Sequence, residues 1–403
     1  MSRLNNLIPD GTRDLLFSSC AVKNRVIERI SSLFKSLGYS EVKTPSFEFF
    51  DVFTSKKEAI PIEDMFKLTD NKGRLIVLRP DCTQPIARVV ATKFKDPVIP
   101  IKLYYNQNVF LMNPSQNGRR NEITQCGVEL IGTNGLLSDI DIIITAIKTL
   151  KQFDLNFKIE IGDVGLFIEI VKALNIDKYD AEKLRKLIER KNYAALNDLL
   201  KSLDRSEKEK QILEKLPQLF GGIEIFDECE KLTSNQNVLT KLSYIKTLYE
   251  NLLELGLGDY ISVDLGLVHH IDYYTGIVFR GYVEGIGEDI LSGGRYDDLL
   301  EQYGTKLPAT GFGINVDALT EFFIKTNKFK LEPQINSLIF CENNRFKEAY
   351  NLINKLREEG ERCEMGLCPN LEEAVKYAKI KKIKKIYVVS NEISILQVEN
   401  EKA

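Results

Sequence analysis

The sequence predicts an α+β protein in which a β-sheet flanked by helices forms the main domain. Residues 74–132 show a strand, a helix and then two strands joined by a loop, judged by their apolar periodicity and turn residues. From about 166 to 257 the pattern is almost wholly helical and charged, and alternating strands return at residue 261. We therefore expect a main domain over 1–325 with a helical insertion at about 166–257, followed by a small α/β domain over 332–403.

Individual elements follow from local signals. Residues 22–37 carry apolar side chains at helical spacing, and Gly38 is a natural C-terminal stop. Residues 75–78 (LIVL) are apolar enough for a buried strand, and residues 157–163 alternate with period two, as strands do. Ser138 is expected to cap the apolar helix that follows it.

The bulk composition describes an ordinary globular chain. It has 403 residues, 43% of them hydrophobic and 28% charged, with a net charge of −3. A dedicated nucleic-acid binder usually carries a basic excess, so this balance gives no reason to expect such a partner. For the local basic run near the C-terminus we favour a solvated helix face over a remnant of tRNA affinity. This run comprises lysines 376, 379, 381, 382, 384 and 385.

Cysteine usage indicates reduced thiols and a cytoplasmic location. The count of seven is odd, and the first residues resemble neither a signal nor a transit peptide. Cys363 and Cys368 lie close together, but both histidines are far away in sequence, which argues against a zinc site. We find no apolar run of transmembrane length and expect no metal and no cofactor.

Three stretches resemble histidyl-tRNA synthetase. Residues 78–132 (LRPDCT to VELIG) are similar to its active-site strands and motif 2 loop, and residues 267–279 (LVHHIDYYTGIVF) to its histidine-specific motif. Residues 291–319 resemble its closing segment and motif 3. The resemblance covers residues 1 to about 325 and implies the antiparallel sheet of a class II aminoacyl-tRNA synthetase, with an inserted helical domain. The C-terminal domain resembles, with little specificity, a shortened anticodon-binding domain.

A further stretch, residues 41–53, carries Pro45 before an aromatic-rich run. On the residues alone it is an edge strand with a proline. Its distance from the LRPDCT motif favours a resemblance to class II motif 1, which in that family builds the dimer interface.

Arginines of the family pattern are missing at three positions. Leu111, His269 and Ala318 stand where the family has arginine, and Asn113 replaces the motif 2 acid that faces the adenine. Activation of a carboxylate by ATP develops negative charge on phosphate, which guanidinium groups are best suited to hold. We therefore expect a chain that has lost the catalytic chemistry.

The resemblance implies that a histidine-binding pocket remains. Two acids could bracket a ligand ammonium, a glutamine could meet its polar part, and tyrosines could enclose its imidazole ring. The residues that match the family's histidine contacts are Asp81, Thr83, Gln125, Glu129, Tyr274 and Tyr296.

Taken singly, these residues have simpler explanations. Asp81 can cap the following helix, and Tyr274 and Tyr296 can be core aromatics with satisfied hydroxyl groups. Glu129 can point outward from a half-buried strand. Their order and spacing together favour the pocket.

Two departures from the family affect this pocket. Asp81 stands where the family usually has glutamate and is one methylene shorter. The pair His269-His270 replaces Arg-Gly and could close the pocket or bind an anion. Arg119 and Arg295 are further candidates for contact with a carboxylate or phosphate.

A synthetase-like chain of this length without the catalytic arginines resembles the regulatory subunits of ATP phosphoribosyltransferase. The resemblance implies a homodimer within a hetero-octamer that activates a short-form catalytic subunit and takes part in feedback inhibition by free histidine. The alternatives are a degraded histidyl-tRNA synthetase and a synthetase-derived module that binds tRNA or protein.

Overall fold

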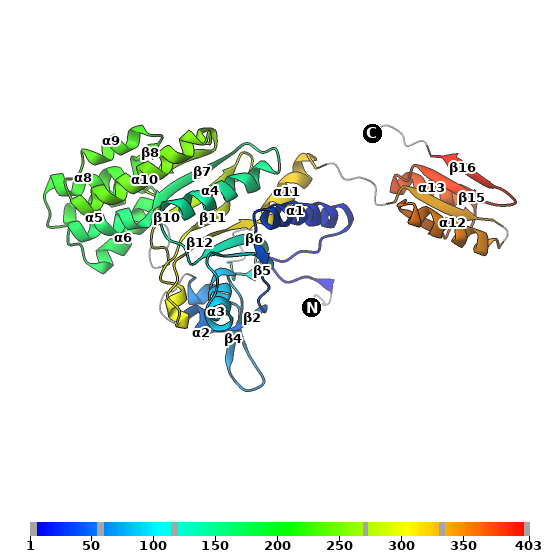
Figure 1. Ribbon diagram of the computed structural model, residues 1–403, viewed down its shortest axis with the longest axis horizontal. Helices are drawn as coiled ribbons and strands as arrows, with labels where there is room; N and C mark the ends of the chain where they lie inside the picture. Colours follow the sequence, from blue (N-terminus) through cyan, green and yellow to red (C-terminus); the bar gives the residue numbers. More distant parts are fainter. Residues whose placement is uncertain are drawn as a thin grey trace. The chain divides into compact units, whose positions relative to one another are not determined.

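The computed structural model describes residues 6–54, 60–113, 120–268, 273–329, 335–342 and 344–398. Contacts within the chain divide it into two compact units, residues 1–328 and 329–403 (Figure 1). The first unit contains a large sheet, a small sheet and two groups of helices, and the second is a four-stranded α/β unit.

A nine-stranded sheet organises the first unit. Its neighbouring strands are antiparallel except for the pairs β1–β5 and β7–β9, which are parallel. The spatial order is β1 (Ser40–Glu41), β5 (Ile101–Phe110), β6 (Glu122–Ile131), β12 (Ala309–Asn315), β11 (Asp289–Arg295), β10 (Ile277–Val283), β7 (Phe157–Asp163), β9 (Ile261–Asp264) and β8 (Phe220–Gly221). This mostly antiparallel sheet confirms the fold class expected from the sequence.

Three helices pack together against this sheet: α1 (Phe17–Ser36), α4 (Leu136–Lys151) and α11 (Val316–Thr326) (Figure 1). The expected helix at 22–37 is α1, and Gly38 follows it with a φ of +83°. The Phe34 ring is fully buried, with its centroid 6.0 Å from the centroids of both Tyr104 and Phe312. Phe34 therefore joins the helix layer to strands β5 and β12.

The beginning of α4 differs from expectation. Its N-cap residue is Gly135 with a φ of +94°, not Ser138. Ser138 lies inside the first turn, where its hydroxyl donates a 2.8 Å hydrogen bond to the Gly135 carbonyl. Because glycine tolerates this positive φ, the helix begins earlier than the serine cap predicted.

A small sheet and two helices lie before the hairpin of β5 and β6 in the chain. The sheet has the order β2 (Phe47–Phe49), β4 (Leu75–Leu78) and β3 (Lys67–Thr69), and the helices are α2 (Asp51–Thr54) and α3 (Thr83–Lys93). The expectation that β4 is a buried strand is wrong, since only Val77 is buried and Leu75 is 42% exposed. A three-stranded sheet of this size leaves much of its surface open to solvent.

Between β7 and β9 the chain contributes only the two-residue strand β8 to the large sheet. The intervening segment is mostly helical and contains α5 (Val164–Ala173), α6 (Lys178–Glu189), α7 (Tyr193–Ser202), α8 (Glu207–Lys215), α9 (Glu224–Glu230) and α10 (Gln236–Glu254). Short 3₁₀ helices lie at η2 (Ile62–Asp64), η4 (Leu216–Gln218), η5 (Gly258–Tyr260) and η6 (Leu300–Tyr303).

The second unit has the sheet order β14-β13-β15-β16. Its elements are β13 (Ser337–Cys341), α12 (Phe346–Glu358), β14 (Cys363–Gly366), α13 (Leu371–Lys381), β15 (Lys385–Val389) and β16 (Ile393–Gln397). The sequence pattern did not predict β16, an edge strand whose residues are all exposed. Lys376 pairs with Glu372 and Glu373 on its own helix, as on a solvated helix face.

Replacing Phe34 by alanine should lower the free energy of unfolding of the first unit by about 3–5 kcal/mol, because it removes a fully buried ring between α1 and the sheet. Urea denaturation followed by circular dichroism measures the change. Phe17→Ala on the same helix is the matched control, since this ring is 79% exposed. Equal losses in the two variants would contradict the packing described.

Candidate functional site

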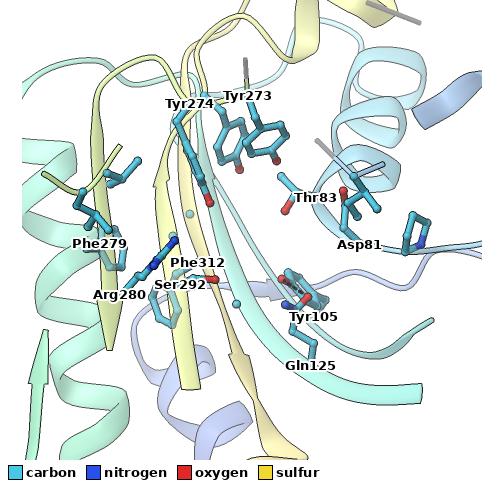
Figure 2. A pocket seen from close by; sticks show the side chains of 18 residues that line it. Asp81, Thr83, Tyr105, Gln125, Tyr273, Tyr274, Phe279, Arg280, Ser292 and Phe312 are labelled. Atoms are coloured by element: carbon cyan, nitrogen blue, oxygen red, sulfur yellow. Dashed lines mark hydrogen bonds between the residues drawn. The ribbon is translucent and has the colours of Figure 1, made fainter. Parts of the chain in front are cut away.

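A cavity of about 230 Å³ opens on the large sheet beside the N-terminus of α3 (Figure 2). It is smaller than the pockets of about 300–1,000 Å³ that hold drug-sized ligands, so it suits a ligand the size of an amino acid. Five of the six predicted histidine contacts line it: Asp81, Thr83, Gln125, Tyr274 and Tyr296. The structure therefore brings together residues from α3, β6 and the two segments that flank β10 and β11.

Glu129, the sixth predicted contact, lies directly behind the lining residues. Its carboxylate accepts hydrogen bonds from the Thr83 hydroxyl, at 2.8 Å, and from the Tyr296 hydroxyl. The alternative that Glu129 points outward is wrong, since the residue is 1% exposed. Burial raises its pKa to about 8, although the hydrogen bonds from Tyr296 and Thr83 act in the opposite direction.

Asp81 has two roles in the structure. Its Oδ1 accepts a 2.9 Å hydrogen bond from the backbone N–H of Gln84, which caps the start of α3 as the simpler explanation proposed. It also lines the cavity, so the cap and the pocket are compatible. Burial raises the pKa of Asp81 to about 6, against the lowering effect of the backbone N–H groups of Gln84 and Thr83.

Glycines on the central strands make room for these side chains. A Cβ at Gly311 would collide with the Glu129 carboxylate, and one at Gly313 would lie 2.5 Å from the Gln125 amide. A Cβ at Gly294 would lie 2.9 Å from the Tyr274 ring. The floor of the pocket therefore has to lack side chains at these positions.

The aromatic wall is larger than the sequence predicted. The Tyr273 ring centroid lies 5.5 Å from that of Tyr296 and 5.0 Å from that of Tyr274. Tyr105 donates a 3.1 Å hydrogen bond to the side-chain oxygen of Gln125, which fixes the orientation of that amide. Tyr105 and Tyr273 were not among the predicted contacts, although strand periodicity places Tyr105 opposite Gly127 on β6.

Arg280 is a charged lining residue that was not predicted from the sequence. It lies on β10, and its guanidinium points into the pocket region below Tyr274 (Figure 2). A single arginine within the apolar run IVFRGYV is unusual, but this local pattern does not show whether its side chain faces solvent or a cavity.

Of the three predicted anion contacts, only Arg295 lies among the described residues. Arg295 does not line the cavity, because its guanidinium is held by Asp139, Asp297, Ser138 and the Thr133 carbonyl. These contacts use all five of its N–H donors, so Arg295 would have to exchange one of them to bind an anion. Arg119 and His269, the other two candidates, lie outside the described residues, as does His270.

Two of the three positions that lack arginine are described. The Leu111 backbone N–H donates to the Asn121 carbonyl at 2.9 Å, and Ala318 lies in the first turn of α11, capped by Asn315. Beside it, the buried Asp317 carboxylate pairs with Lys23 at 2.9 Å and with Arg120 at 3.1 Å. The Arg120 guanidinium is thus already paired with an acid of α11.

Asn113 is held within the hairpin connection. Its side-chain amide donates to the Arg120 carbonyl at 2.7 Å, and its backbone N–H donates to the Asn121 side chain at 2.9 Å.

Over the described part of the chain, no three His, Cys, Asp or Glu side chains are arranged to hold a metal ion. No helix among the described residues is long and apolar enough to cross a membrane.

Known proteins that are similar to this chain support first its fold and then its family. A histidyl-tRNA synthetase family model matches residues 11–319, so the main unit is that of a histidyl-tRNA synthetase-like protein of class II fold. A histidyl-tRNA synthetase structure from Nostoc sp. PCC 7120 has a TM-score of 0.82 at 20% identity, over 98% of this chain and 95% of that one, and shows the fold alone.

More similar relatives are ATP phosphoribosyltransferase regulatory subunits. Those of Clostridium botulinum (strain 657) and Clostridium acetobutylicum are each 44% identical, covering 95% and 96% of this chain and 92% and 96% of their own lengths. A crystal structure of an ATP phosphoribosyltransferase regulatory subunit/histidyl-tRNA synthetase from Bacillus halodurans has a TM-score of 0.85 at 33% identity, over 95% and 97% of the two chains. The chain belongs to the family of ATP phosphoribosyltransferase regulatory subunits.

Glu129→Gln should make the stability of the ligand-free protein less sensitive to pH. The folded-state pKa of Glu129, about 8, lies above the ordinary value of 4.5, so its stabilising contribution is complete below about 4.5 and is lost as the pH rises to 8. Glutamine does not ionise. Urea denaturation at pH 5, 6.5 and 8 measures the free energy of unfolding of both proteins. As the pH rises, the value for the variant should increase relative to that of the wild type by on the order of 1 kcal/mol per pH unit. A difference that does not change with pH would contradict this assignment.

Proposed function

We propose that the chain activates a short-form ATP phosphoribosyltransferase catalytic subunit and binds free histidine as the feedback inhibitor of the first step of histidine biosynthesis. The observation that carries this proposal is a retained amino-acid-sized pocket in a chain with Leu111, His269 and Ala318 at the family's arginine positions. The pocket supports ligand recognition, and the missing arginines argue against adenylation.

The geometry of the pocket supports histidine as its ligand. The Asp81 carboxylate and the Gln125 side-chain oxygen offer acceptors to an ammonium group, and Tyr274 provides an aromatic wall. Glu129, with a folded-state pKa near 8, can donate or accept a hydrogen bond at an imidazole nitrogen, depending on its protonation. These assignments correspond to the synthetase's amino-acid pocket.

The chemistry of phosphate stabilisation supports a non-catalytic role. In phosphoryl-transfer systems one well-placed arginine contributes on the order of 10³–10⁵ in rate. Leucine and alanine have no side-chain donor, and histidine offers a single-point donor that is mostly neutral near pH 7. We therefore assign the transferase chemistry to the catalytic partner.

We place the chain as a homodimer within a hetero-octamer, as the resemblance to the family implies. Exposed apolar side chains gather beside β1, the strand that begins the motif 1-like stretch, and include Val98 and Phe94. Such a patch is typical of a surface covered by another subunit. The second unit corresponds in this proposal to a shortened anticodon-binding domain.

Titration of this chain into a purified short-form catalytic subunit should raise the rate of phosphoribosyl-ATP formation, and histidine should reverse the increase. Enzyme assays with and without histidine, together with co-elution by size exclusion, measure both effects. No change in rate and no co-elution would contradict the regulatory role. Histidine-dependent ATP–pyrophosphate exchange by this chain would instead support a degraded synthetase, and salt-dependent RNA affinity a tRNA-binding module.

Histidine at about 100 times its dissociation constant should add roughly 2.7 kcal/mol to the stability of the isolated chain, visible as a shift of a few degrees in the melting temperature. Glu129→Gln should abolish this shift because it removes the buried carboxylate that holds the Thr83 and Tyr296 hydroxyls of the pocket lining. Glu122→Gln on the same strand is the matched control, since Glu122 contacts Asn108 and does not line the cavity. A shift that survives in Glu129→Gln would exclude Glu129 as a histidine contact.

A further inference from the structure

The ligand pocket has an uneven distribution of charge. Of its described lining residues, Asp81 is the only acid and Arg280 the only cation, and Glu129 lies behind the lining on the Thr83 side. Asp81 and Thr83 lie across the pocket from Arg280 (Figure 2). A pocket with a cation on one side and an acid on the other is complementary to a zwitterion.

The strand positions explain how Arg280 reaches the pocket. Arg280 lies opposite Ser292 of β11, and Ser292 lies opposite Gly313 of β12. Because residues directly opposite each other in a sheet point to the same face, Arg280 shares the face on which Gln125 approaches Gly313. The absence of a side chain at Gly313 leaves space between the arginine and the glutamine.

The guanidinium of Arg280 is held less tightly than that of Arg295. Its ion pair with Glu189, the last residue of α6, has an N–O distance of 3.4 Å, beyond the range of a strong charge-assisted hydrogen bond. Glu189 also pairs with Arg185 at 2.8 Å. Arg280 also interacts with Asp289 and Tyr282, and Glu160 lies opposite it on β7, but no ion pair within 4.0 Å joins it to either acid among the described contacts. Arg280 is therefore in a position to exchange a weak partner for a ligand carboxylate.

We infer that Arg280 binds the carboxylate of the pocket's amino-acid ligand, in place of the arginine that the chain lacks at position 269, and that it weakens its contact with Glu189 of the helical insertion when it does so. This inference rests on the proposed function, since it takes an α-amino acid as the ligand. It makes Arg280 the residue that distinguishes an amino acid from its uncharged derivatives. It also connects pocket occupancy to α6.

The electrostatics require a cation for this role. A ligand carboxylate placed in a half-buried pocket near Asp81 and Glu129 would be repelled by any ionised acid and would lose its hydration. A guanidinium offers paired N–H donors that match the two carboxylate oxygens. Arg280 is the described lining residue with those donors.

The test compares L-histidine with L-histidinamide, which keeps the ring and the ammonium but has no carboxylate charge. Isothermal titration calorimetry on the full chain should show that the wild type prefers histidine. Arg280→Gln should weaken histidine binding by roughly 10- to 100-fold, the usual effect of losing a hydrogen-bonded charge, and should change histidinamide binding by less than about fivefold. Arg280→Lys should restore part of the preference.

Arg190→Gln is the matched control, because this exposed arginine adjoins Glu189 and does not line the pocket. It should leave both affinities unchanged. Glu189→Gln should strengthen histidine binding a few-fold, since Arg280 then has no charged competitor on α6.

The outcomes separate this inference from the proposed function. A wild type that binds neither ligand overturns the histidine pocket itself, and this inference with it. A wild type that binds histidine, with Arg280→Gln unchanged, overturns the role of Arg280 alone and points to the 269–272 segment. Equal weakening of both ligands by Arg280→Gln also overturns it, because that result indicates a general structural effect.

Discussion

The carboxylate of Glu129 is the contact on which the site depends. It joins β6 to Thr83, 46 residues earlier, and to Tyr296, 167 residues later, so three distant segments converge on one buried group. Leaving such an acid without these donors inside the fold would be costly, and the hydroxyl groups of both partners are accordingly committed to it. Gly311 of β12 then follows as a requirement, because a side chain at this position would occupy the space of the carboxylate.

The sequence predicted the elements with strong periodicity and the residues that belong to motifs. Helix α1, strands β5, β6 and β7, the helical insertion and five lining residues were found where they were expected. Strand β16 was missed because an exposed edge strand has no buried face to produce alternation. The prediction that Ser138 caps α4 was wrong because the sequence does not distinguish a capping serine from a serine in the first turn. The positive φ of Gly135 shows that the cap lies there.

Long-range charge pairing accounts for the remaining differences. Arg295 lies next to Tyr296 in the chain and was expected near the ligand, yet its partner Asp139 is 156 residues away and draws the guanidinium out of the pocket. Arg280 shows the reverse, since a charged residue in an apolar strand can face solvent or a cavity and nothing local decides which. The first case depends on how α4 packs and the second on which strands are neighbours, and the order β6-β12-β11-β10-β7 is not readable from spacing.

The order of the strands also has a consequence for synthesis on the ribosome. β6 ends at residue 131, but its neighbour β12 begins only at residue 309, after the whole helical insertion. At about 5–20 residues per second, roughly 10–35 s pass between the emergence of the two strands. During that interval the nascent chain presents the edge of β6 and its apolar residues without their final partner. The insertion therefore lengthens the period in which this half-finished sheet needs protection from aggregation by chaperones.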